Sequence, residues 1–170
     1  MRSINLICGP ICSGKTTYCK ERMKGPIDSY IKVSNIVKRL SKAESRKDLQ
    51  NTSNLDEQIA EELIHIIECG MLYHNNFYID GIRQLSIIER LVENFKDNKH
   101  LRIEITWLEV PYKVREERYL QRIRTEDDNV SSEEANKRDN ELGLSSIYKQ
   151  YFNNKLTNEY NEIFCITTFI

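Results

Sequence analysis

The sequence has few residues that break regular structure and no long apolar run. It contains three prolines and six glycines in 170 residues, and no Pro/Gly-rich linker, repeat or low-complexity tract divides it. We therefore expect a single domain over residues 1–170. No stretch reaches the roughly 18 apolar residues of a membrane helix, and the N-terminus lacks a signal-peptide pattern. These absences predict a cytoplasmic protein that does not contact a membrane.

Cysteine is too scattered to form a scaffold. The five cysteines are odd in number and lack metal-ligand spacing, so neither a disulfide framework nor a zinc knuckle is indicated. We expect them to be reduced thiols. A large excess of charge is also lacking, because the formal net charge is −1. The field of the whole molecule would therefore not steer it to a polyanion.

Charge is uneven locally. From Lys32 to Lys47 the charged residues are basic except for Glu44, whereas from residue 56 to residue 68 they are all acidic. Three of the basic residues, Lys38, Lys42 and Arg46, are spaced four residues apart and would form one stripe on a helix. Two interpretations remain open: solvated helix faces, or cations that contact phosphate.

Strand-like and helix-like segments alternate along the chain. We expect strands over residues 3–8, 29–33, 76–80, 101–110 and 163–169. We expect helices over about 15–23, from 34 onward, 54–70, 84–95, 111–124 and from 131, with capping boxes at Asn54 and Ser131. This order predicts an α/β fold: an open parallel sheet covered on both faces, with ligands beyond the carboxyl ends of the strands.

The most specific motif follows the first expected strand: Gly9-Pro10-Ile11-Cys12-Ser13-Gly14-Lys15-Thr16. Its glycines allow backbone N–H groups to surround phosphates, and the helix N-terminus that follows adds partial positive charge. Lys15 would reach the β- and γ-phosphates of ATP, and the Thr16 hydroxyl would ligate Mg²⁺. Cys12 is expected to be a small filler, because nothing pairs it with a base. The predicted ATP-binding residues of the loop are Gly9, Ile11, Cys12, Ser13, Gly14, Lys15, Thr16 and Thr17.

A second motif, Asp80-Gly81-Ile82-Arg83, lies where a strand beside the first should end. Asp80 could hold a magnesium-bound water or accept a proton, and Arg83 could clamp a phosphate of the acceptor. The alternative is a turn-forming Asp-Gly pair followed by a surface arginine. Next to a phosphate-binding loop, we favour the functional interpretation.

A third group consists of four arginines in one expected helix and its C-terminal end: Arg115, Arg118, Arg122 and Arg124. Phosphoryl transfer spreads negative charge over the moving group, and forked arginine donors stabilise that charge. We expect a lid over about residues 112–142, with Arg118 contacting ATP, Arg118 and Arg122 assisting catalysis, and Arg124 contacting the acceptor. The alternative is a solvated helix, because Glu126, Asp127 and Asp128 balance the charge locally.

Together these motifs resemble a family. The loop, the run Ile79-Asp80-Gly81-Ile82-Arg83, the spaced arginines and the later Arg138-Asp139-x-Glu141-Leu142-Gly143 look like the nucleotide kinases related to dephospho-coenzyme A kinase and adenylate kinase, over about residues 3–145. Phage kinases that phosphorylate a hydroxymethylated pyrimidine in DNA have broadly similar organisation. The resemblance implies a P-loop three-layer sandwich with about five parallel strands, a lid, ATP with Mg²⁺, and an acceptor site around residues 34–70.

The sequence departs from that family on the acceptor side. Many relatives carry an acidic residue near the position of Asn35, which favours a phosphate acceptor here because an anionic oxygen needs no base. Asp28 and Asp80 remain alternative bases. The acceptor contacts we predict are Asn35, Lys38, Arg39, Arg83 and Arg124. The stretch after Ile147 also lacks the small-residue and Asp pattern expected near adenine.

These features predict a kinase that moves the γ-phosphoryl group of ATP to a nucleotide-type acceptor, either a free nucleotide or a hydroxymethylated base in DNA. Thr16 and Asp80 would serve the metal, and Lys15, Asp80, Arg83, Arg118 and Arg122 would carry the chemistry. Dephospho-coenzyme A kinase is an alternative within the class. From another class, the alternative is a nucleotide-dependent switch that does not transfer phosphate to a small acceptor.

Overall fold

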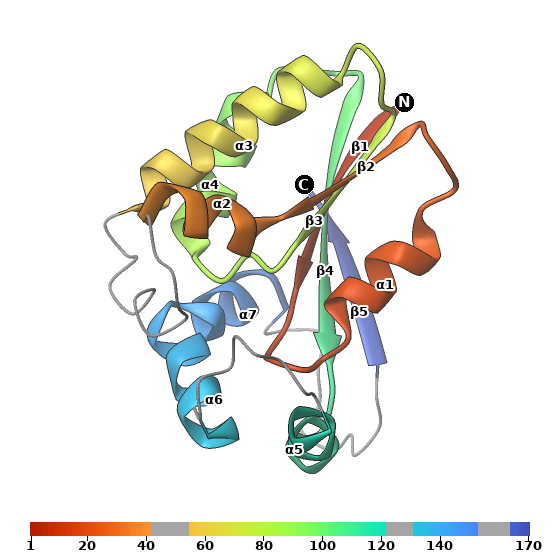
Figure 1. Ribbon diagram of the computed structural model, residues 1–170. Coiled ribbons are helices and arrows are strands. Elements are labelled where there is room, and N and C mark those ends of the chain that lie inside the picture. Colours follow the sequence, from red (N-terminus) through yellow and green to blue (C-terminus); the bar gives the residue numbers. More distant parts are fainter. Residues whose placement is uncertain (42–54, 122–130, 153–163) are drawn as a thin grey trace.

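The fold is an α/β arrangement with a five-stranded sheet (Figure 1). A computed structural model describes residues 1–41, 55–121, 131–152 and 164–170. The strands are β1 (Arg2–Cys8), β2 (Asp28–Lys32), β3 (Asn76–Asp80), β4 (Leu101–Glu109) and β5 (Phe164–Phe169). The helices are α1 (Lys15–Arg22), α2 (Val33–Ser41), α3 (Asp56–Gly70), α4 (Leu85–Phe95), α5 (Tyr112–Leu120), α6 (Ser132–Glu141) and α7 (Leu144–Phe152).

The sheet has the strand order β2-β3-β1-β4-β5. The sequence had led us to expect a fully parallel sheet, but one pair of strands is antiparallel. β1 to β4 are parallel, and β5 pairs antiparallel with β4, Phe169 lying opposite Glu104 and Phe164 opposite Glu109. The expectation of a fully parallel sheet was therefore wrong at its last strand. An apolar run predicts that a strand forms, but it does not predict the direction of that strand in the sheet. The direction depends on which end of the sheet the strand enters from.

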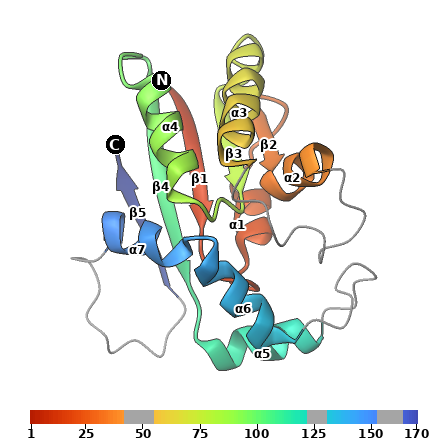
Figure 2. The same cartoon turned by 90° about the vertical axis from the view of Figure 1, so that its left-hand side faces the viewer.

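Helices cover both faces of the sheet. α1 packs on one face, and α3, α4 and α7 pack on the other (Figures 1 and 2). The larger core lies under α3 and α4 and includes Leu6, Phe77 and Leu63, all fully buried. A smaller cluster under α1 joins Ile7 and Cys19 to Leu108. The alternation of Leu6 and Ile7 to opposite faces is the period of two that a strand imposes.

The parallel strands end at one edge of the sheet, and α5 and α6 lie beyond that edge (Figure 1). This arrangement fits the general rule that ligands of open α/β sheets bind outside the carboxyl ends of the strands. In the described residues, no helix is both long enough and apolar enough to cross a membrane.

Two local predictions can be compared with the helix ends. α6 begins as expected: the Ser131 side chain accepts from Glu134 N, and the Glu134 carboxylate accepts from Ser131 N. At α3 the N-cap is Leu55, which makes no side-chain cap hydrogen bond. Asn54, the residue predicted to cap the helix, lies outside the described residues, so that capping box stays a prediction. The sequence analysis also missed α7 as a separate helix.

Candidate functional site

The loop between β1 and α1 has the backbone shape of a phosphate cradle. Gly9, Cys12 and Gly14 adopt positive φ angles of 142°, 60° and 92°. A Cβ on Gly9 would lie 2.6 Å from Leu108 O and 2.9 Å from Ser13 Oγ, so no other residue fits there without a shift. Gly14 stands as the N-cap of α1, where the first helical N–H groups have no intrahelical acceptor.

Lys15 folds back over this loop. Its ammonium donates to Gly9 O at 2.8 Å and to Pro10 O at 2.7 Å. Burial, together with the nearby Arg83 guanidinium, lowers the pKa of Lys15 to about 8, while Asp139 and Asp80 act in the opposite direction. The Lys15 ammonium is thus held by the carbonyls of the loop in a buried position, where a nearby anion would stabilise its charged form.

Asp80 forms a hydrogen-bonded cluster with Thr16 and Tyr30. Its Oδ2 accepts from Thr16 Oγ1 and from Tyr30 OH, each at 2.6 Å. Asp80 is 4% exposed, so its carboxylate depends on these partners for its stability. Burial raises the pKa of Tyr30 above its ordinary range, and the bond to Asp80 raises it further, so Tyr30 stays a donor.

Thr16 and Asp80 would fit a magnesium ion. Mg²⁺ takes oxygen ligands, is often held by one or two protein groups, and keeps waters and substrate phosphates as its other ligands. A hydroxyl and a carboxylate 2.6 Å apart beside the loop form such a pair. Among the described residues, no cluster of three or more His, Cys, Asp or Glu side chains forms a metal cage, which this mode of binding does not need.

A carboxylate from α6 also reaches the loop. Asp139 Oδ2 accepts from Ile11 N at 2.7 Å, and Asp139 Oδ1 lies 3.0 Å from Arg83 Nε. The structure thus brings Arg83 and the loop together through Asp139. Asp139 belongs to the motif Arg138-Asp139-x-Glu141, but no local pattern predicts its role, because its partner Ile11 lies 128 residues away in the sequence.

Of the predicted lid arginines, Arg118 lies at the loop. Its Nη1 donates to Cys12 O at 3.2 Å. Arg115 has a structural position instead: it is 9% exposed and donates to Val110 O and to Asn136 Oδ1. Arg122 and Arg124 lie outside the described residues, so their predicted roles stay predictions.

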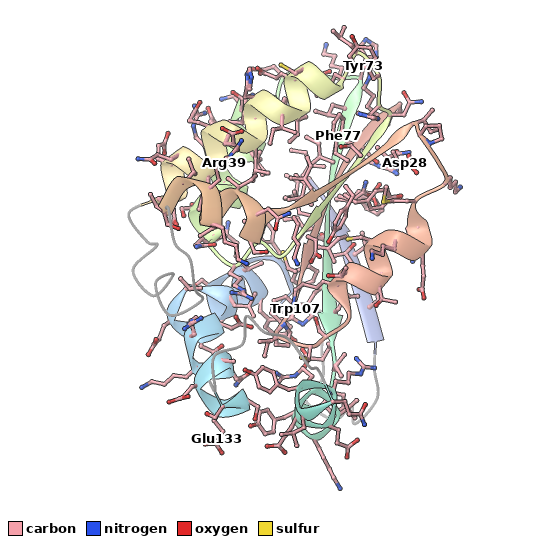
Figure 3. The ribbon with its side chains drawn as sticks, in the orientation of Figure 1. Asp28, Arg39, Tyr73, Phe77, Trp107 and Glu133 are labelled. Carbon is pink, nitrogen blue, oxygen red and sulfur yellow. The ribbon has the colours of Figure 1, made fainter. Side chains whose placement is uncertain are left out.

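The predicted acceptor residues Asn35, Lys38 and Arg39 lie on α2, the helix that follows β2. Asn35 is exposed, and Arg39 pairs with Glu62 of α3 at 2.5 Å (Figure 3). Lys38 is partly exposed on the same helix, while Lys42 and Arg46 lie outside the described residues. The described part of the basic stripe therefore reduces to Lys38.

Asp28 is not placed to act as a base at the loop. It lies at the amino end of β2, four positions before Lys32, which is the register partner of Asp80. Its carboxylate accepts from Lys24 N at 2.6 Å and from Asn76 Nδ2 at 2.7 Å. Four strand residues span about 13 Å, so Asp28 lies at the end of the sheet opposite to the one that carries Asp80 and the loop (Figure 3).

Tyr30 is the site residue that the sequence analysis overlooked. It lies on the same face of β2 as Lys32, two residues along, and it contacts Asp80 from the neighbouring strand. The expected strand at 29–33 placed Tyr30 and Lys32 on one face. The partner across the sheet was unknown until the strand order and register were seen.

Comparison with known proteins identifies the fold and nothing finer. No protein-family model matches the chain, and no curated protein matches its sequence. A chain of the Pnkp1/Rnl/Hen1 RNA repair complex has a TM-score of 0.55 and 14% identity, covering 86% of this chain but 45% of its own length. The tunicamycin resistance protein of Deinococcus radiodurans has a TM-score of 0.50 and 20% identity, covering 88% of this chain and 93% of its own. The chain thus spans less than half of the repair-complex chain.

Proposed function

We propose that this protein is an ATP-dependent phosphotransferase that moves the γ-phosphoryl group to a nucleotide-type acceptor. The observation that carries the proposal is the convergence of Lys15, Thr16 and Asp80 at a glycine-bearing loop between a parallel strand and a helix. Each of these groups matches one need of a bound triphosphate: a cation, a hydroxyl ligand for Mg²⁺ and a carboxylate beside it.

The residues would act by positioning and by electrostatic stabilisation. Backbone N–H groups of the loop and of the first turn of α1 would hold the phosphates, and Lys15 would exchange its carbonyl partners for phosphate oxygens. Thr16 and Asp80 would hold Mg²⁺, which neutralises charge on the β- and γ-phosphates when bound. Arg118 would add a forked donor where charge develops.

In the transfer step, an acceptor oxygen forms a bond to the γ-phosphorus while the bond to the β,γ-bridging oxygen breaks, and ADP leaves. A phosphate acceptor supplies an anionic oxygen and needs no base. The exposed amide of Asn35 on the acceptor side supports this kind of acceptor. The acceptor would be a free nucleotide, through its phosphate oxygen, or a hydroxymethylated pyrimidine in DNA. In the second case the acceptor is a hydroxyl whose proton Asp80 would accept, and the base would be flipped or single-stranded.

The solved structures agree with the proposal at the level of fold. The chain from the RNA repair complex and the resistance protein share this α/β arrangement, which is compatible with phosphoryl transfer. The function is argued from the site, because one fold hosts many functions. They do not identify the acceptor. Its identity rests on the site and on experiment.

A panel of acceptors incubated with ATP labelled at the γ-phosphate tests the proposal. The panel should include free pyrimidine mononucleotides, DNA that contains hydroxymethyluracil, and dephospho-coenzyme A. Transfer of label to a mononucleotide or to the DNA base supports the proposal. Transfer to dephospho-coenzyme A alone would reassign the acceptor, and ATP binding without transfer to any acceptor would favour the nucleotide-dependent switch.

A further inference from the structure

Asp139 is a charged residue on a surface helix, yet its side chain is almost fully buried. It lies in the last turn of α6, yet it is 1% exposed, and it contacts a loop residue 128 positions earlier in the chain. Burying a carboxylate is costly unless charge and hydrogen bonds compensate for the lost water. The partners of Asp139 therefore account for its burial.

The two carboxylate oxygens have different partners. Oδ2 accepts from Ile11 N at 2.7 Å and so fixes the loop at its third residue. Oδ1 lies 3.0 Å from Arg83 Nε, close enough for a strong ion pair. That nitrogen is buried but not aligned to donate a hydrogen bond, so the attraction is mainly electrostatic. One side chain thus joins α6, the loop and the residue after β3.

The way Arg83 is held bears on what it can bind. Asp139 engages the inner nitrogen of the guanidinium, Nε, rather than the two terminal nitrogens. Within the described part of the chain, the close contact of this ion pair is at Nε, and no hydrogen bond holds the two terminal nitrogens. An arginine fixed through Nε keeps its terminal donors for an oxyanion, and its geometry is set before the anion arrives.

We propose that Asp139 is a positioning residue for the phosphoryl acceptor: it holds Arg83 so that the terminal guanidinium nitrogens bind an anionic oxygen group of the acceptor, while it fixes the loop through Ile11. This inference rests on the proposed function and assigns the acceptor an anionic group at Arg83. The simpler alternative is that Asp139 only anchors α6 to the loop.

The substitution Asp139→Asn separates the two roles. Asparagine keeps an oxygen that can accept from Ile11 N, but it presents an amide donor to Arg83 and removes the charge. If Asp139 positions Arg83, kcat/KM for the acceptor falls about 10- to 100-fold, because small misplacements of a positioning group cost rates of this order. ATP affinity, measured by equilibrium binding, changes less than about threefold because the loop contact survives.

The control variant is Glu141→Gln in the same helix. The Glu141 side chain is 63% exposed and lies 3.7 Å from Lys137 Nζ in a surface ion pair, so this variant should match the wild type. The acceptors used are the free pyrimidine mononucleotide and hydroxymethyluracil DNA of the panel above. If the wild type transfers phosphate to neither, the proposed function fails; if it transfers while Asp139→Asn keeps wild-type kinetics, only this inference fails.

A double-mutant cycle with Arg83→Gln tests whether Asp139 acts through Arg83. Because Asp139 acts through Arg83, adding Asp139→Asn to Arg83→Gln should lower acceptor kcat/KM by less than about threefold more. Independent losses that multiply, or a matching loss of ATP affinity, would show that Asp139 is an anchor and overturn the proposal. Should Asp139→Asn not fold, Arg83→Lys keeps a cation for Asp139 but lacks the fork, and wild-type acceptor kinetics in that variant would overturn the proposal equally.

Discussion

At the scale of single residues, the site holds a buried cation, Lys15, that a bound phosphate would stabilise. Lys15 is held by the carbonyls of its own loop, at a position where burial lowers its pKa to about 8. Bound phosphates would reverse that shift, because a nearby anion favours the charged form. If the loop binds a nucleotide as proposed, binding and protonation of Lys15 are linked.

This linkage predicts how ATP affinity depends on pH. Below about 8 the free protein already carries the proton, so affinity should be nearly constant. Above it the free protein has lost the proton and binding must recover it, so the dissociation constant should rise by up to about tenfold per pH unit. Calorimetry at pH 7 and 9, in two buffers of different ionisation enthalpy, measures both the affinity and the proton uptake. A wild-type pH dependence no steeper than that of Lys15→Ala would contradict it.

Replacing Gly9 by alanine should destabilise the protein. Alanine there would place its Cβ 2.6 Å from Leu108 O at a φ of 142°, whereas Gly25 has a φ of 140° but nothing within 4 Å of the same atom. Gly9→Ala should lower the free energy of unfolding by about 2 to 4 kcal/mol, and Gly25→Ala by about 1 kcal/mol. Urea denaturation of both variants measures the difference. Equal costs would mean that Leu108 moves aside freely.

At the scale of elements, α5 carries two arginines with different predicted roles: Arg115, with buried structural contacts, and Arg118, which we propose acts in catalysis. Arg115→Ala removes buried hydrogen bonds to Val110 O and Asn136 Oδ1 and should destabilise the protein by about 2 to 3 kcal/mol. Arg118→Ala removes a single contact with the loop and should leave stability within about 0.5 kcal/mol. It should lower kcat about 10- to 100-fold while raising KM for ATP much less, as expected of a transition-state contact.

Thermal melts and steady-state kinetics on both variants check this contrast. The expected pattern is one variant that is unstable and one that is slow. If Arg118→Ala changed only the melting temperature, the predicted role of α5 in catalysis would be wrong.

The elements also show which features a single sequence can predict. Periodicity and turn residues located β1, β3, β4 and the glycine loop within a residue or two, because these depend on local patterns. The direction of β5 and the existence of α7 depend on how distant segments pack, and both were missed. In the site, Lys15 and Thr16 followed from a motif, whereas Tyr30 and Asp139 act through partners 50 and 128 residues away and left no local pattern.

At the scale of the whole molecule, the net charge of −1 leaves the acceptor undecided between a nucleotide and a nucleic acid. If the acceptor is DNA, the basic stripe predicted from the sequence, Lys38, Lys42 and Arg46, would contact successive phosphates. Three cations spaced four residues apart on a helix would span about 12 Å. Neutralising all three should then flatten the salt dependence of binding, by about 0.7 to 0.9 in log–log slope per lost contact. Assays on hydroxymethyluracil DNA and the matching mononucleotide, each at two salt concentrations, measure this slope. Transfer to the mononucleotide alone, with unaltered kinetics in the triple variant, would leave the stripe as a solvated face.

The central claim is that the loop of Lys15 and Thr16 transfers phosphate from ATP, and one measurement tests it most directly. Wild-type protein and Lys15→Ala are incubated with Mg²⁺ and γ-labelled ATP together with the acceptor panel, and label in the acceptor is counted. We predict transfer by the wild type and a loss of at least about 100-fold in the variant, because one electrostatic contact to the transition state is gone. The variant should still melt cooperatively. Equal turnover of the two proteins would contradict the assignment of this loop as the site of phosphoryl transfer.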